Sequence, residues 1–182
     1  MKLINSITAL FLIAILLPNP STAQDSLDYS PNHFETNDDL TKELNLVYIG
    51  ASWCKPCIKD SLKQALEEAK ITFYERAKEM DMNYSVIGVA NNQSVQKGWD
   101  FLNSSGYFDE VVIGKQWRNS GSLEFIMKPK EVRPAIPQII VFSRPLIFEE
   151  GIKVGNKQIL VRKVGAVAIH KWVEEGMPLN SN

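Results

Sequence analysis

The sequence has few of the residues that covalently cross-linked or metal-centred folds need. Only two of its 182 residues are cysteine and two are histidine. Two cysteines cannot build a disulfide-dense miniprotein, and they fall short of a four-ligand zinc site unless other residues join them. The scarcity predicts a fold held together by its core and a chemistry that uses few residues.

An excess of charge of either sign is also missing. The 20 Lys and Arg residues nearly balance the 21 Asp and Glu residues, and the formal net charge is -1. No strong basic field is available to hold a phosphate backbone, so nucleic acid is not expected as a partner. Hydrophobic residues make up 45% of the chain, which is typical of a globular protein and not of a disordered one.

The one long apolar run lies at the N-terminus. Residues 7–17 are almost purely apolar, follow Lys2, and end at two prolines and three small residues. This layout is typical of a secretory signal peptide, whereas a membrane-spanning helix needs about 20 apolar residues. We expect residues 1–23 to be a signal peptide cleaved after Ala23. The mature protein is then expected to be periplasmic or secreted, with no membrane span left.

The remaining chain divides into an arm and one domain. Residues 24–43 are largely polar and have little periodic pattern, which predicts a flexible N-terminal arm. Residues 44–178 alternate short apolar runs with helical patterns, which predicts one α/β domain with a central mixed sheet flanked by helices. Strands are expected at 46–49, 84–90 and 139–142, and helices at 58–73, 95–102 and 166–175.

Several finer features of this domain are also predicted from side-chain spacing. The segments 108–114 and 123–127 each resemble a short strand, and 149–165 resembles a hairpin that turns near Gly155. Residues Asn91 to Ser94 supply the capping chemistry for the helix at 95–102. That helix is expected to bury Val95, Trp99 and Leu102, and Trp117 and Tyr107 are also expected in the core. Asp60, Glu67 and Glu68 are expected to form a solvated helix face with Lys59, Lys63 and Lys70.

The two cysteines lie where the first strand ends and the first helix begins. A helix N-terminus carries unpaired N–H groups and a partial positive charge, which would stabilise a thiolate at Cys54 and lower its pKa. Lys55 adds a nearby cation, and Pro56 suits an early helical position. Cys54 is expected to be open to a client, and Cys57, one turn further on, is expected to be less exposed. Cys54 is therefore predicted to attack, and Cys57 to resolve the mixed disulfide.

Two other interpretations of the cysteine pair remain open from the residues alone. A purely stabilising bridge would close a loop of four residues, which supplies only about 2 kcal/mol in the chain-entropy model. A metal site, such as that of a copper delivery protein, would need further ligands. His33 lies in the arm and His170 on the last helix, so neither is an obvious ligand. No bound metal or other cofactor is expected.

The motifs GASWCKPC at residues 50–57 and AIPQIIVF at 135–142 resemble the thioredoxin superfamily. The style is that of exported thiol:disulfide oxidoreductases of the TlpA, ResA and DsbE kind. The resemblance covers about residues 44–175 and implies a thioredoxin-like fold, with an insertion near 91–130 between the Cys-x-x-Cys helix and the cis-proline strand. It also implies a cis bond between Ile136 and Pro137, in a loop that faces the cysteines.

The resemblance further implies an activity, disulfide exchange with the cysteines of exported proteins, helped by an unidentified redox partner. Pro56 in the second intervening position resembles reductive members, which favours a reductase. A thioredoxin-fold binding module with a fixed disulfide is the alternative. Many thioredoxins have a buried Asp where this chain has Tyr48, so the usual proton acceptor for Cys57 is missing. Substrate contacts are implied for Trp53, Lys55, Pro56, Ile136 and Pro137.

Overall fold

The computed structural model describes residues 41–129, 133–148 and 151–179. The expected signal peptide and most of the expected arm, with His33, lie outside these residues. In the described ranges no helix combines the length and apolar character that a membrane crossing requires.

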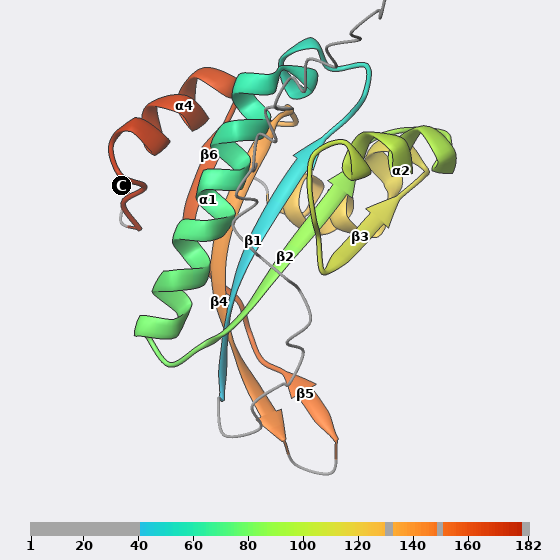
Figure 1. Ribbon diagram of the computed structural model, residues 1–182. Helices are drawn as coiled ribbons and strands as arrows, with labels where there is room; N and C mark the ends of the chain where they lie inside the picture. Colours follow the sequence, from blue (N-terminus) through green and yellow to red (C-terminus); the bar gives the residue numbers. More distant parts are fainter. Residues whose placement is uncertain (1–40, 130–132, 149–150, 180–182) are drawn as a thin grey trace, which may run out of the picture.

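The centre of the molecule is a mixed sheet. In the order β3-β2-β1-β4-β5, the first three strands are parallel to one another and β4 runs antiparallel to β1. A sixth strand, β6, also pairs with β4. Figure 1 shows β1, β2 and β4 running side by side through the molecule. The strands are β1 (Lys42–Gly50), β2 (Asn83–Ala90), β3 (Glu110–Ile113), β4 (Gln138–Phe148), β5 (Ile152–Val154) and β6 (Gln158–Val164).

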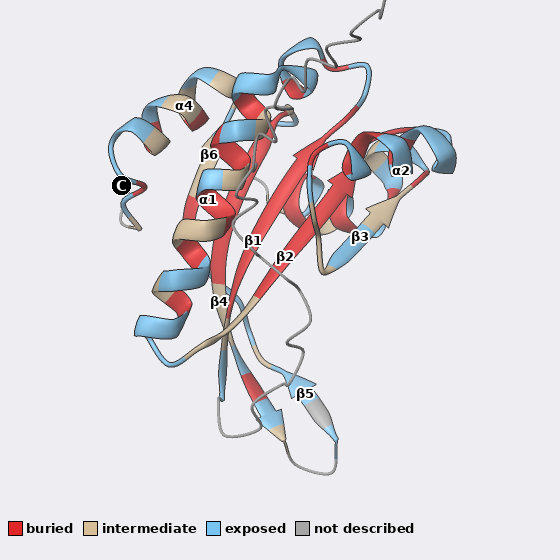
Figure 2. Cartoon of the chain, viewed as in Figure 1, coloured by how far each residue is buried: buried red, intermediate tan, exposed pale blue. Residues whose placement is uncertain are grey.

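Helices cover both faces of this sheet, because neighbouring side chains of a strand point to opposite faces. Leu46 and Tyr48 face a core shared with α1, α2 and α4, whereas Val47 and Ile49 face a second core closed by η3. Figure 2 shows β1 and β2 buried along most of their length between these layers. The helical elements are η1 (Lys55–Ile58), α1 (Asp60–Glu79), α2 (Val95–Asn103), η2 (Gln116–Arg118), α3 (Ser120–Ser122), η3 (Leu123–Met127) and α4 (Ala166–Glu174). The predicted α/β architecture is confirmed.

The segment 123–127, predicted as a strand, is helical. Leu123–Met127 forms the π-helix η3, entered through the short α3. The Asn119 side chain caps α3 by accepting a hydrogen bond of 2.7 Å from the Ser122 amide. A five-residue apolar run fits a strand or a buried helical turn equally well, and the cap upstream decides the outcome here.

The predicted hairpin over 149–165 is also wrong. β5 and β6 do not pair with each other, because both pair with β4. β4 extends to Phe148, well past the predicted end at residue 142, and is long enough to hold β6 along its first half and β5 along its last three residues. The turn residues near Gly155 therefore connect two strands that share a partner.

The helix α2 begins as expected but turns a different face to the core. The Ser94 side chain accepts from the Lys97 amide, which is the cap that the sequence predicts. Val95 and Trp99, however, are 65% and 50% exposed, and the buried positions are Gly98, Phe101 and Leu102. A Cβ at Gly98 would lie 2.4 Å from an Ile113 methyl group. Glycine thus lets α2 lie directly on the β2–β3 edge, with Trp99 outward.

Lys70 was expected on the solvated face of α1, yet it is almost fully buried. Its ammonium lies 2.6 Å from Glu67 Oε1 and donates to the Ser105 carbonyl at 3.1 Å. It also lies 4.2 Å from the centroid of the Phe108 ring. The loop between α2 and β3 covers this lysine, and burial lowers the pKa of Lys70 despite the neighbouring Glu67.

Lys70→Met is expected to change how stability depends on pH. Because the folded-state pKa of Lys70 lies below its ordinary value of 10.5, the unfolded chain holds more of this proton in the window between the two values. The free energy of unfolding of the native protein therefore rises with pH through that window, by at most about 1.4 kcal/mol per pH unit. Urea denaturation from pH 7 to about 10.5 measures this rise. The variant should lack it, and Lys153→Met, at an exposed position, should retain it. Parallel curves for all three proteins would contradict the prediction.

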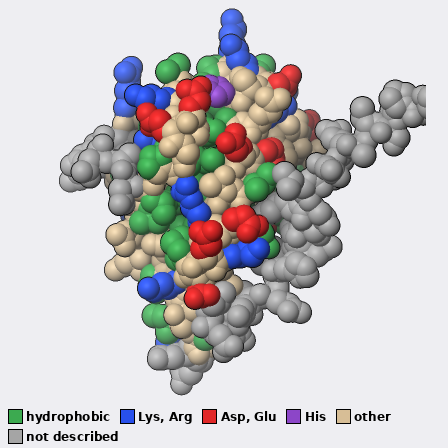
Figure 3. Space-filling view, turned by 60° about the vertical axis from the view of Figure 1, so that its left-hand side comes forward, with side chains coloured by type: hydrophobic (Ala, Val, Ile, Leu, Met, Phe, Trp, Pro, Cys, Tyr) green, Lys and Arg blue, Asp and Glu red, His purple; other side chains and the backbone are tan. Residues whose placement is uncertain are grey.

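The surface carries charges of both signs. On the face shown in Figure 3, acidic and basic side chains are interspersed, and neither sign forms an extensive field. This agrees with the near balance of charges in the sequence.

Candidate functional site

Cys54 and Cys57 are joined by a disulfide at the end of β1. Their Cα atoms are 5.2 Å apart, and the Cys57 amide donates to the Cys54 carbonyl at 2.9 Å. The cysteines lie on the one-turn 3-10 helix η1, with Cys54 as its N-cap and Pro56 in its first turn. The sequence predicted the long helix to follow directly, but Lys59 is extended and α1 starts only at Asp60. Cys54 therefore faces the N–H groups of a short turn, a weaker positive end than that of α1.

The two cysteines differ in exposure, but less than expected. Cys54 is 6% exposed and Cys57 is fully buried. The predicted order is right, whereas the open position expected for Cys54 is wrong, since its side chain lies largely covered in the disulfide form. Its Sγ lies 3.9 Å from the carbonyl oxygen of Ile136, which places the loop before β4 against this sulfur. Trp53, Lys55 and Pro56 beside it are exposed.

The Ile136–Pro137 bond is cis, as the resemblance implies. Ile136 is half-buried and packs against both cores, and Pro137 is buried. The Pro137 carbonyl accepts from the Gly165 amide at 2.8 Å. The structure thus brings Ile136 and Pro137 to the disulfide, next to the exposed Trp53, Lys55 and Pro56.

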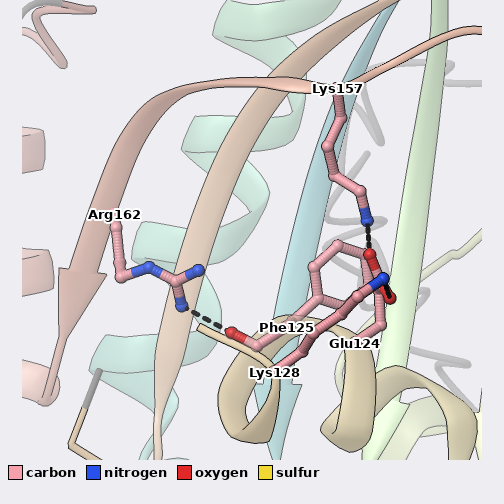
Figure 4. A network of polar contacts seen from close by, with 5 residues as sticks. All are labelled: Glu124, Phe125, Lys128, Lys157 and Arg162. Carbon is pink, nitrogen blue, oxygen red and sulfur yellow. Dashed lines mark hydrogen bonds and ion pairs between the residues drawn. The ribbon is translucent and has the colours of Figure 1, made fainter. Parts of the chain in front are cut away.

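A side-chain network that the sequence analysis missed holds this loop. Gln138 donates to the Ala135 carbonyl at 2.7 Å and accepts from Arg162 Nη1 at 2.8 Å. The same nitrogen donates to the Phe125 carbonyl in η3 at 2.9 Å, as Figure 4 shows. Burial lowers the pKa of Arg162, but a guanidinium stays charged at any pH relevant here. The sequence signal was a polar residue, Gln138, directly before the apolar run at 139–142.

A second contact beside this network fixes η3 to the loop between β5 and β6. Glu124 in η3 accepts from Lys157 and, at 3.0 Å, from Lys128 (Figure 4). These two hydrogen bonds lower the pKa of Glu124. The Lys157 ammonium also lies 4.7 Å from the centroid of the Phe125 ring. The Glu124–Lys157 pair therefore attaches η3 to the residue before β6, at the end of that strand away from the cis-proline loop.

The loop that carries Trp53 is fixed to the loop after β2. The Ser52 amide donates to Asn92 Oδ1 at 3.3 Å, and Asn92 Nδ2 donates to Ser52 Oγ at 2.7 Å. Trp53 Nε1 donates to the Asn91 carbonyl at 3.0 Å. The sequence analysis assigned these asparagines to helix capping alone. The signal for their second role was two polar residues directly after a buried parallel strand, level with the end of β1.

Tyr48 occupies the position where many thioredoxins have a buried acid. Its hydroxyl is buried and donates to the Cys57 carbonyl at 3.4 Å. Burial raises the pKa of Tyr48 well above its ordinary value of 10.0, so the phenol is neutral and cannot accept a proton from Cys57 as a carboxylate does. The described part of the chain also holds no cluster of three or more His, Cys, Asp or Glu side chains suited to a metal ion.

Comparison with known proteins finds a likeness among solved structures. No protein-family model and no curated protein matches the chain. The solution structure of a thiol:disulfide interchange protein from Bacteroides sp. is similar at 15% sequence identity and a TM-score of 0.41, over 75% of this chain and 74% of that one. The class follows from the molecule's own geometry. It is an α/β protein in which a disulfide-bonded Cys-x-x-Cys pair at the end of a mixed sheet lies against a cis-proline loop, the arrangement that the sequence resemblance implies.

Proposed function

We propose that this protein is a thiol:disulfide oxidoreductase that exchanges disulfides with cysteines of other proteins. The observation that carries the proposal is the position of Cys54, whose Sγ lies 3.9 Å from the Ile136 carbonyl at the cis bond. A client cysteine that reaches this sulfur also meets the exposed Trp53 and Pro56. Cys57, which is bonded to Cys54 through the disulfide, is fully buried.

The exchange needs only these two sulfurs. In the reduced protein the Cys54 thiolate attacks one sulfur of a client disulfide, forming a mixed disulfide while the other client sulfur leaves as a thiolate. Cys57 then loses its proton to solvent and attacks Cys54 Sγ, which releases the second client thiolate. Two electrons have passed to the client, whose thiolates take up two protons. The protein is left with the Cys54–Cys57 disulfide found here, and an external dithiol must reduce it again.

Two finer parts of the proposal rest on the sequence. The signal-peptide pattern of residues 1–23 supports export, with exported proteins as clients. Pro56 between the cysteines supports the reductive direction. The specific likeness to proteins of the TlpA, ResA and DsbE kind stays a prediction.

One observation favours a second candidate, a thioredoxin-fold binding module with a fixed disulfide. Both cysteines are largely covered, at 6% and 0% exposure for Cys54 and Cys57. Such a bridge would stay oxidised, and the exposed surface around it would only bind a partner.

The reduction potential of the cysteine pair separates the two candidates. The oxidised protein is equilibrated in glutathione and dithiothreitol buffers of defined potential, and free thiols are counted by alkylation and mass spectrometry. We expect a two-electron transition between about -270 mV, the thioredoxin value, and about -120 mV, the value of a strong oxidant, nearer the former. A pair that stays oxidised below about -300 mV behaves as a structural disulfide and would overturn the enzymatic proposal.

A further inference from the structure

We infer that a pocket beside Trp53 receives an acidic side chain of the client next to its reacting cysteine, and that Lys97 determines this preference. The inference rests on the proposed function and names a class of substrate for it. The shape, rigidity and charge of the pocket support this inference, and so does its position beside the two residues that precede Cys54.

The pocket opens directly next to the disulfide. It has a volume of about 370 Å³, and its walls include Ser52 and Trp53, the two residues before Cys54. Asn92, which is hydrogen-bonded to Ser52, belongs to the same wall, and Lys97 on the first turn of α2 also lines the pocket, with Gln116. An extended peptide advances about 3.3 to 3.6 Å per residue. A client bonded to Cys54 therefore brings the residue one or two positions from its own cysteine to this pocket.

The walls of the pocket are already fixed before a client binds. Trp53 Nε1 is bonded to the Asn91 carbonyl, and the Trp53 ring centroid lies 6.5 Å from that of Trp117. Ser52 and Asn92 are joined by two hydrogen bonds, so the Asn92 amide is satisfied within the protein. A preformed pocket costs little ordering free energy when a ligand enters.

The charge of the pocket is positive and unmatched. Lys97 is its one charged lining residue and is exposed. None of the ion pairs found over residues 41–129, 133–148 and 151–179 involves Lys97. Asp100, one turn further along α2, accepts a hydrogen bond of 2.8 Å from Gln96. Since no lining residue is acidic, a client Asp or Glu is attracted here and a client Lys is repelled.

The test measures formation of the mixed disulfide with defined peptides. Reduced Cys57→Ser protein, in which Cys54 attacks but nothing resolves, is mixed with symmetrical disulfides of capped pentapeptides that carry Asp, Asn or Lys beside the cysteine. The Cys54 thiolate forms one bond to a peptide sulfur and releases the other peptide as a thiolate, so electrons balance without a further reagent. Mass spectrometry follows the rate. Each peptide is compared between Lys97 and Lys97→Glu proteins, which cancels the peptide's own reactivity.

We expect Lys97→Glu to slow the Asp peptide and to speed the Lys peptide by about two- to fivefold each, the range of an exposed ion pair. The Asn peptide should change least, and 0.5 M salt should reduce both effects. Lys153→Glu is the matched control, because Lys153 lies on β5 at the opposite end of β4 from the cis-proline loop (Figure 1). The inference would be overturned if each peptide reacted at the same rate with the Lys97 protein and with Lys97→Glu. It would also be overturned if Lys153→Glu changed the rates as much as Lys97→Glu does.

A neutral disulfide distinguishes failure of the pocket inference from failure of the proposed function. Bis(2-hydroxyethyl) disulfide reports the reactivity of Cys54 without charge recognition. If Cys54 reacts with it but the peptides show no charge preference, the pocket inference alone is wrong. If Cys54 reacts with no disulfide, the proposed function is wrong as well.

Discussion

Cys57→Ser is expected to accumulate a mixed disulfide with client proteins, whereas Cys54→Ser is expected to accumulate none. Cys57 is fully buried behind Cys54, so the sulfur that first meets a client is that of Cys54. Without Cys57 nothing inside the protein attacks the Cys54–client bond, and release falls to the slow rate of external thiols. In the Cys54→Ser protein the remaining thiol is both covered and desolvated, and exchange falls to the uncatalysed rate.

The measurement is non-reducing electrophoresis with mass spectrometry after acid quenching. A protein carrying both substitutions is the control for non-covalent complexes, and added dithiothreitol should release every trapped client. Trapping that is equal in the two single variants would contradict the assigned order of the cysteines. Its absence in both would favour the binding module.

Trp172→Ala is expected to lower the free energy of unfolding by about 3 to 5 kcal/mol, the range for large aromatic residues cut back in a core. Trp172 on α4 is fully buried and stacks on Phe73 of α1, with ring centroids 5.6 Å apart. Its Nε1 also donates to the Pro178 carbonyl at 3.1 Å. The substitution therefore removes the main contact between the two helices and leaves a cavity where they meet the sheet.

Urea denaturation of the oxidised protein measures this loss. Val167→Ala is the matched control on the same helix, because Val167 is 84% exposed, and it should change stability by less than about 0.5 kcal/mol. A loss below about 1.5 kcal/mol for Trp172→Ala would show that α4 contributes little to the folded core.

The parts of the fold that the sequence predicted well are those with a strong local signal. Three elements follow from a clear pattern of apolar residues. They are the strand that ends at Gly50, the strand that ends at Ala90 and the helix that buries Ile169 and Trp172. Ser94 was found as a cap because capping depends on a few neighbouring residues. The cis bond before Pro137 came from the family resemblance, since local sequence alone rarely specifies it.

The parts that were missed depend on residues distant in the chain. Lys70 is charged, which predicts an exposed position, and only the loop carrying Ser105 and Phe108 makes that position a buried one. The partners of Asn92 and Gln138 lie 40 and 24 residues away, at Ser52 and Arg162. Hydrogen bonds of this kind leave no periodic pattern.

The cover over Cys54 was missed for the same reason. The loop that lies against this sulfur, with the Ile136 carbonyl oxygen 3.9 Å from Cys54 Sγ, is 82 residues further along the chain and was placed here by the family resemblance alone. Sequence periodicity predicts which face of an element is buried. It does not predict which distant loop closes over that face.

One nitrogen of the Arg162 guanidinium binds both η3 and β4, so the positions of Phe125 and Gln138 depend on each other. Arg162 Nη1 carries two hydrogens, and one goes to the Phe125 carbonyl and the other to Gln138 Oε1. Because one atom serves both, a change that moves η3 also alters how Gln138 is held, and the reverse applies. Substitutions in the two segments are therefore not additive. A variant that displaces η3 is therefore expected to displace the first residue of β4 as well, and with it the loop that ends at Pro137.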